Sequence, residues 1–338
     1  MAIEQKTTIL NLYNSGISPD IISLELDLST NEVMQIINSE VTDDKRRKIA
    51  AKKLMGTPLL NRSYLDTAVN IDSAIKNAQI RMWKALKGQP EFNISLEQTQ
   101  NILERYAESK INLVILYVDL VGSTRLSMML PIDRLTVIIR AFTQEMFLMV
   151  STYGGYVLKY IGDAVLAFFV VQDVENDTDY GDGRIIGSND DDNMSYLQCS
   201  NAINCAGSMI KVIREGINPI LDQYGYPELS IRVGIDFGQD AVVQYGWDTQ
   251  AIDYDDNSER RIFKKPHLDI LGHTISIATK MTSIAKQNQI VIGQSLYDIL
   301  DDRQRNTFRP IKANQSIWNY VDDVKGDVYK IYGSISEK

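Results

Sequence analysis

The stretch LVILYVDLVGSTR, residues 113–125, decides the fold of this chain. Five of its first six residues are apolar, and a short apolar run that ends at a turn is typical of a buried β-strand. The strand closes on a carboxylate, Asp119, just before a Gly-Ser-Thr turn. Because an ionised carboxylate is rarely buried alone, Asp119 needs a partner.

A second carboxylate stands in a similar setting, in the stretch GGYVLKYIGDAVLAFF, residues 154–169. Two apolar strands, 155–160 and 164–170, are joined there by a tight Gly162-Asp163 hairpin. Gly-Asp is common in hairpin turns, so Asp163 alone could be a turn residue. We expect the hairpin strands to lie beside the first strand, which would bring Asp163 near Asp119.

Two neighbouring carboxylates repel each other unless a cation lies between them. Mg²⁺ prefers carboxylate oxygens and water, with substrate phosphates completing its shell. The turn after Asp119 leads into a helix and can direct backbone N–H groups, together with the Ser123 and Thr124 hydroxyls, toward an anion. These residues therefore predict metal-assisted phosphoryl chemistry with one or two metals.

From residue 113 onward, strands alternate with long helices, and a β-α-β-β-α-β order predicts an α+β, ferredoxin-like fold. Two stretches interrupt this order: the acidic, Gly-rich residues 173–193, which we interpret as a mobile insertion, and the polar residues 247–266. The expected strands are 113–119, 155–160, 164–170, 230–236, 241–245 and 290–292, and the expected helices are 132–152, 196–223 and 272–286.

The first forty residues predict three short helices that resemble a helix-turn-helix unit. Ser18 with Pro19 is typical of a helix start, and Ser29 with Glu32 is spaced as a capping box. The third helix offers no Arg or Lys for reading DNA bases, although the basic run 45–53 could contact phosphates. We therefore favour a regulatory, protein-contacting bundle over a DNA-binding one.

The composition limits the possible partners, the location of the protein and the state of its cysteines. The net charge of -9 argues against a dominant nucleic-acid surface. No stretch approaches 18 uncharged apolar residues, and the N-terminus lacks the pattern of a signal peptide, so we expect a cytoplasmic protein without a membrane anchor. The two cysteines, Cys199 and Cys205, are expected to be reduced core residues.

Four motifs in order resemble those of the class III nucleotidyl cyclase catalytic domain: YVDLVGST, GGYVLKYIGDAVLAFF, IRVGIDFGQDAVVQYG and the run from LDILGHTISIATK to SLYDIL. The resemblance implies a catalytic domain over 111–338, after a helix-turn-helix-like unit (1–40) and a helical connector (41–110). It also implies a head-to-tail homodimer that builds its active sites at the interface. Such enzymes convert a nucleoside triphosphate to a 3′,5′-cyclic nucleotide and pyrophosphate.

The resemblance assigns a role to each motif. It implies that two Mg²⁺ or Mn²⁺ ions are held by Asp119, Asp163 and the backbone carbonyl of Leu120. Base choice falls to Lys159 and Asp269; a Lys donor and an Asp acceptor suit adenine, which favours ATP and an adenylate cyclase. The triphosphate would be bound by Val121, Gly122, Ser123, Thr124 and, near the C-terminus, Lys325.

The chain departs from the family pattern at several catalytic positions. Ser276 and Lys280 stand where the family usually has an Asn that orients the ribose and an Arg that stabilises the transition state. Lys keeps the charge but lacks the planar fork of donors. Gln239 and His273 also differ from the usual residues. Two alternatives stay open: a degenerate domain that binds nucleotide as a sensor or scaffold, and a cyclase that acts on GTP or, as in phage defence, on a pyrimidine nucleotide.

Overall fold

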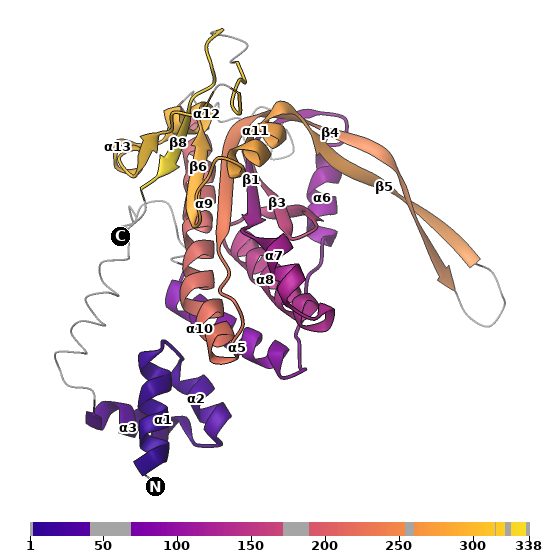
Figure 1. The fold of residues 1–338 in the computed structure, drawn as a ribbon. Helices are drawn as coiled ribbons and strands as arrows, with labels where there is room; N and C mark the ends of the chain where they lie inside the picture. Colours follow the sequence, from indigo (N-terminus) through magenta and orange to yellow (C-terminus); the bar gives the residue numbers. More distant parts are fainter. Residues whose placement is uncertain are drawn as a thin grey trace. The chain divides into compact units, whose positions relative to one another are not determined.

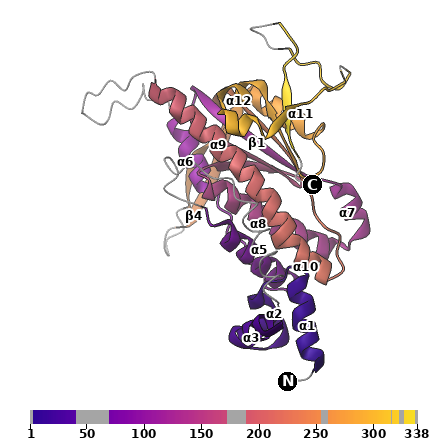
Figure 2. The ribbon, with the colours of Figure 1, turned by 90° about the vertical axis from the view of Figure 1, so that its left-hand side faces the viewer.

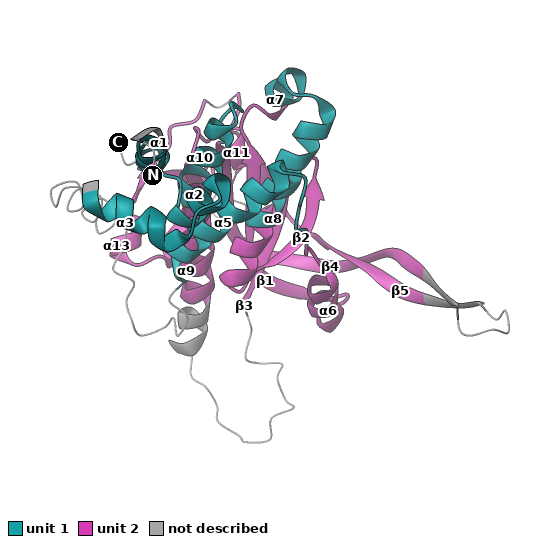
Figure 3. Cartoon of the chain, turned by 90° about the horizontal axis from the view of Figure 1, so that it is seen from below, with its two compact units in different colours: residues 1–92, 124–145, 211–229 teal, residues 93–123, 146–210, 230–338 magenta. Residues whose placement is uncertain are grey.

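A computed structural model describes residues 3–40, 69–171, 189–253, 260–314, 316–321 and 326–335. The chain divides into two compact units, shown in Figure 3. Unit 1 comprises residues 1–92, 124–145 and 211–229, and unit 2 comprises residues 93–123, 146–210 and 230–338.

Unit 2 is built on an eight-stranded sheet with the order β2-β3-β1-β4-β6-β8-β7, and β5 pairs with β4. The central strand β1 runs antiparallel to both β3 and β4, whereas β4 and β6 are parallel. The strands are β1 (Lys110–Leu120), β2 (Tyr156–Ile161), β3 (Ala164–Val171), β4 (Ile231–Asp253), β5 (Arg260–Leu271), β6 (Gln289–Gly293), β7 (Phe308–Pro310) and β8 (Ile331–Ser334).

The helices complete a β-α-β-β-α-β order, because α8 (Ile132–Thr152) connects β1 to β2 and α9 (Asn189–Lys211) connects β3 to β4. This order, seen in Figure 1, confirms the predicted α+β, ferredoxin-like class. The remaining helices of unit 2 are α6 (Glu97–Arg105), α11 (His273–Thr282), α12 (Gln294–Ile299) and α13 (Asp302–Arg305).

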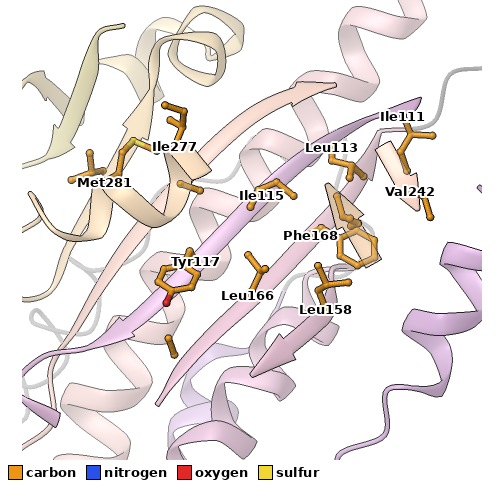
Figure 4. Packing of buried hydrophobic residues seen from close by; sticks show 14 of the residues in the cluster. Ile111, Leu113, Ile115, Tyr117, Leu158, Leu166, Phe168, Val242, Ile277 and Met281 are labelled. Carbon is orange, nitrogen blue, oxygen red and sulfur yellow. The ribbon is translucent and has the colours of Figure 1, made fainter. Parts of the chain in front are cut away.

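The core of unit 2 explains why the opening stretch is apolar without interruption. Alternate residues of β1, among them Leu113, Ile115 and Tyr117, lie on one face of the sheet, under Ile277 and Met281 of α11 (Figure 4). The intervening residues Val114, Leu116 and Val118 are fully buried as well. A strand buried on both faces shows no polar alternation, so β1 reads as a continuous apolar run.

The described part of the polar stretch 247–266, residues 247–253 and 260–266, is β-strand, which corrects the prediction that this stretch interrupts the sheet. β4 continues without a break to Asp253 and pairs with β5 along a long two-stranded arm that Figure 1 shows projecting from the sheet. The expected gap between strands 230–236 and 241–245 is likewise absent. The stretch is polar in sequence, and the backbone pairing that joins its two strands leaves little trace in a sequence.

The predicted helix 196–223 is helical over its whole length and ends where expected, but its start is wrong and its middle is not α-helical. α9 begins at Asn189, inside the expected insertion, and it is followed by a π-helix, η2 (Val212–Ile217), and by α10 (Asn218–Gln223). Residues 173–188 of that insertion lie outside the described residues. The predicted helix 132–152 matches α8, and the expected helix 272–286 is α11 without its last residues.

In unit 1 the first forty residues form the three expected helices, α1 (Ile3–Asn14), α2 (Pro19–Leu26) and α3 (Thr30–Glu40). The predicted capping box is present: Ser29 N donates to Glu32 Oε2 over 2.9 Å, and Glu32 N donates to Ser29 Oγ over 3.3 Å. Ser18 takes the N-cap position of α2 without a side-chain capping bond. The basic run 45–53 lies outside the described residues.

Helix α5 (Ile71–Leu86) ties the N-terminal helices to the rest of unit 1. The buried Gln79 accepts a hydrogen bond from Ser18 N and donates to the carbonyls of Gly16 and of Glu215 in η2. Trp83 Nε1 donates to Glu25 of α2. These bonds join α5 to the turn between α1 and α2 and to one side of α2, so they anchor the three N-terminal helices within unit 1. Figure 2 shows α1, α2 and α3 together in indigo.

Among the described residues one helix, α8, is long and apolar enough by composition to cross a membrane. Its fully buried residues include Ile138, Phe142, Met146 and Val150, which recur every four positions. That spacing forms one stripe along a helix, as expected for a helix that packs inside a protein.

Candidate functional site

The structure places Asp119 and Asp163 at the same end of the central sheet. Asp119 is the penultimate residue of β1. Asp163 lies in the β2–β3 turn, directly after Gly162 in the sequence, and Gly162 has a φ of +64°. Val118 pairs with Val165, so this turn sits beside the end of β1. Burial raises the pKa of the Tyr117 phenol, and the negative charges of both aspartates add to the effect, so both carboxylates lie near Tyr117.

The two carboxylates differ in their partners. Asp119 Oδ2 accepts from Nη2 of Arg232 at 2.5 Å, and Arg232 is its register partner on β4. Asp163 Oδ2 is buried without a hydrogen-bond partner among the described residues. An orphaned buried carboxylate oxygen is costly, and a cation would satisfy it.

The residues present fit a hard divalent cation bound with its substrate. Across the described ranges, no cluster of three or more His, Cys, Asp and Glu side chains is arranged to hold a metal. The Asp119 and Asp163 carboxylates and the Leu120 carbonyl are too few to coordinate a metal ion by themselves. They suit Mg²⁺ whose remaining ligands are substrate phosphates and water.

The turn after β1 supplies fewer backbone donors than the sequence suggests. Val121 N already donates to the carbonyl of Ser230 over 2.8 Å, so it is not free for a phosphate. Gly122 has a φ of +72° and is exposed, and helix α7 (Ser123–Met129) starts directly after it. Thr124 is exposed and belongs to unit 1.

The structure brings Lys159 and Asp269 together, although they are 110 residues apart in the chain. Lys159 Nζ forms an ion pair with Asp269 Oδ2, and Asp269 Oδ1 accepts from the amide of Ile270. Helix α6 holds their two strands: Thr99 Oγ1 donates to the Val157 carbonyl of β2 over 2.8 Å, and the Gln100 amide bonds both backbone groups of Leu268 in β5.

Ser276 and Lys280 lie one turn apart on the exposed face of α11. The opposite face, with Ala278 and Met281, is buried against the sheet. No hydrogen bond or ion pair joins either side chain to the two aspartates in the part of the chain that the structure describes. Both residues are therefore presented outward, where a second chain could meet them.

Two further carboxylates, absent from the sequence prediction, are buried on β4. Burial raises the pKa of Asp236 to about 7, although Tyr329 donates a hydrogen bond to it over 2.8 Å. Burial also raises the pKa of Asp240, whose carboxylate fills the space that a Cβ on Gly272 would need. Isolated Asp residues in an apolar strand were the only signal for them.

The remaining residues named in the sequence analysis are placed as follows. Gln239 is exposed on β4, and His273 is exposed at the first position of α11. Lys325 lies outside the described residues. Cys199 and Cys205 are free and buried, as expected.

The chain is similar to several named proteins, although no family model matches it. It is 25% identical over 213 residues to a cytidylate cyclase of Escherichia coli and 27% identical over 207 residues to a cytidylate cyclase of Staphylococcus aureus. These matches cover 62% and 61% of this chain but 40% and 41% of the relatives, so the chain spans about two fifths of the length of the curated relatives it matches.

Solved structures with a similar fold include the adenylyl cyclase CyaB from P. aeruginosa, with 19% identity and a TM-score of 0.44 over 68% of this chain and 96% of that one. The guanylyl cyclase Cya2 has 18% identity and a TM-score of 0.44 over 68% and 95%. The curated relatives that the chain matches are themselves named as nucleotidyl cyclases, which confirms the predicted resemblance to the class III cyclases.

Proposed function

We propose that this chain carries the catalytic domain of a class III nucleotidyl cyclase, which closes a nucleoside triphosphate to its 3′,5′-cyclic monophosphate and releases pyrophosphate. One observation carries the proposal: Asp119 and Asp163 lie at one end of the sheet, and Asp163 presents a buried oxygen that no described residue hydrogen-bonds. The names of the curated relatives support the same reaction class.

In this proposal Asp119, Asp163 and the Leu120 carbonyl hold Mg²⁺ or Mn²⁺, two ions per site. The metals lower the pKa of the attacking 3′-hydroxyl and neutralise the phosphates. The turn residues Gly122 and Ser123, which belong to unit 2 with both aspartates, bind the triphosphate, with Lys325 as a further contact. The backbone N–H of Val121 already donates to the Ser230 carbonyl, so Val121 is not assigned to the phosphates. The chain's own task is to align the 3′-oxygen with the α-phosphorus.

We propose CTP as the first substrate, because the relatives are named cytidylate cyclases. The Lys159–Asp269 pair supports this choice as well as it supports ATP. Cytosine and adenine both carry an exocyclic amine that can donate to Asp269, beside a ring nitrogen that can accept from Lys159. Guanine and uracil carry a carbonyl oxygen in place of that amine, so the pair disfavours GTP and UTP.

The active site would be completed by a second copy of the chain. Ser276 and Lys280 stand on the exposed face of α11, and the reaction needs a cation opposite the α-phosphate. In a symmetric dimer each chain would lend these two residues to the other's aspartates. We place this dimer in the cytoplasm, with the N-terminal helices as a contact for a regulatory protein partner.

The test incubates the protein with each of the four ribonucleoside triphosphates and Mn²⁺ and identifies products by mass. We expect cyclic CMP as the main product, and cyclic AMP would move the proposal to the second substrate. Because Ser276 and Lys280 replace the usual Asn and Arg, a nucleotide-binding domain without turnover is the competing function. Nucleotide binding with no cyclic product from any triphosphate would establish that alternative.

A further inference from the structure

Arg232 occupies a position where a positive charge matters for the proposed site. It lies on β4 directly across from Asp119, and its Nη2 is 2.5 Å from Asp119 Oδ2. Both side chains are only partly exposed, 29% for Arg232 and 24% for Asp119. A guanidinium therefore already neutralises one of the two carboxylates that the proposed function gives to metal ions.

The geometry of the Arg232–Asp119 ion pair suits a contact that another cation can replace. A strong Arg–carboxylate pair uses two parallel N–H groups, whereas here a single nitrogen contacts a single oxygen. Arg232 Nε is buried without an acceptor among the described residues. The guanidinium is thus incompletely satisfied where it stands, and the pair lacks the bidentate fork that would make it hard to break.

A divalent metal and the guanidinium compete for the same group. A metal that binds Asp119 takes lone pairs on its oxygens, and one of these oxygens holds Arg232. Like charges at ion-pair distance also repel, so the metal gains most when the guanidinium moves away. Within the described ranges no cationic side chain bonds the buried oxygen of Asp163, so the competition concerns Asp119.

We propose that Arg232 is a positioning residue that holds Asp119 while the chain is free of metal and gives the carboxylate up when a divalent cation binds. This inference rests on the proposed function, because it takes Asp119 as a metal ligand. The exchange keeps Asp119 paired at every stage, so the strand end does not carry an unpaired charge before the substrate arrives.

The first test measures Mn²⁺ binding by electron paramagnetic resonance, on the full chain and without nucleotide. Arg232→Gln removes the competing charge, and we expect Mn²⁺ to bind about fivefold more tightly, the effect of an ion pair of modest strength. Arg309→Gln is the matched control, because exposed Arg309 bonds, among the described residues, to the nearby carbonyls of Asn306 and Phe308, and it should bind as wild type does. Unchanged or weaker Mn²⁺ binding by Arg232→Gln would overturn the exchange.

Two further variants exclude a merely structural effect. Arg232→Lys keeps the charge and should stay close to the wild-type affinity. In an Asp119→Asn background, Arg232→Gln should have no effect, because the shared ligand is gone. If Arg232→Gln does not fold, wild-type chain is titrated with Mg²⁺ and the Arg232 guanidinium is followed by NMR: its resonances should shift at saturation, and unshifted resonances contradict the inference.

The assays separate this inference from the proposed function. Cyclic product with unaltered Mn²⁺ affinity in Arg232→Gln leaves the cyclase in place and removes the exchange. If Arg232→Gln binds Mn²⁺ fivefold more tightly but no cyclic product forms, the exchange is kept and the proposed cyclase activity is removed. If neither wild type nor Arg232→Gln binds Mn²⁺ without nucleotide, the exchange falls, whereas the metal site of the proposed function, which includes substrate phosphates, is judged by the cyclisation assay.

Discussion

Gln79 offers a quantitative test of how the N-terminal helices are attached. Its side chain is 2% exposed and makes three hydrogen bonds: it accepts from Ser18 N at 2.9 Å and donates to the carbonyls of Gly16 at 2.8 Å and Glu215 at 2.9 Å. Each such bond contributes about 1 kcal/mol net, and a buried group left unsatisfied costs somewhat more. Gln79→Ala should therefore lower the free energy of unfolding by about 2–4 kcal/mol.

The assay is urea denaturation of the full chain followed by circular dichroism. Gln35→Ala is the matched control, because Gln35 is exposed on α3, and it should change the free energy by less than about 0.5 kcal/mol. Gln79→Glu should be no better than Gln79→Ala, since a carboxylate cannot donate to the Gly16 and Glu215 carbonyls. A loss no larger than that of the Gln35→Ala control would refute the view that Gln79 anchors α1 and α2.

Two other predictions concern the shared site and the buried carboxylate. Mixing the inactive Asp119→Ala and Lys280→Ala chains should restore about a quarter of wild-type activity, because random pairing makes half of the dimers mixed and each mixed dimer has one intact site; no recovery in a cyclisation assay would contradict a site shared between chains. Asp236, whose pKa burial raises from 3.8 to about 7, is protonated in the folded protein at pH values where it is ionised in the unfolded chain. Stability should thus fall as pH rises toward 7, and thermal unfolding between about pH 5 and about pH 8 should show a flatter dependence in Asp236→Asn; identical slopes would contradict the assignment.

The parts of the fold that the sequence predicts are those that pack. α8 follows from an apolar stripe of period near four, and β1 and β3 follow from short apolar runs bounded by glycine turns. The outer part of the β4–β5 pair was missed because its sequence is polar and backbone pairing alone leaves little pattern in a sequence. The short strands β7 and β8 are missed for a similar reason, since three or four residues carry too little pattern.

The candidate site could also be predicted only in part from the sequence. Asp119 and Asp163 can be placed together because they end strands that the hairpin makes neighbours. The Lys159–Asp269 pair depends on α6 holding β2 to β5, which only the three-dimensional structure shows. Arg232 could not be linked to Asp119 from the sequence, because their pairing requires the register of β1 against β4, which tertiary packing sets.

The most direct test of the central claim compares three chains with CTP and Mn²⁺: wild type, Asp163→Ala and Asp222→Ala. Asp163 carries the orphaned oxygen of the proposed metal site, whereas Asp222 is an exposed aspartate of α10. We predict that wild type and Asp222→Ala form 3′,5′-cyclic CMP at similar rates, and that Asp163→Ala is slower by about a hundredfold or more. Equal rates for Asp163→Ala and Asp222→Ala would contradict the two-aspartate site.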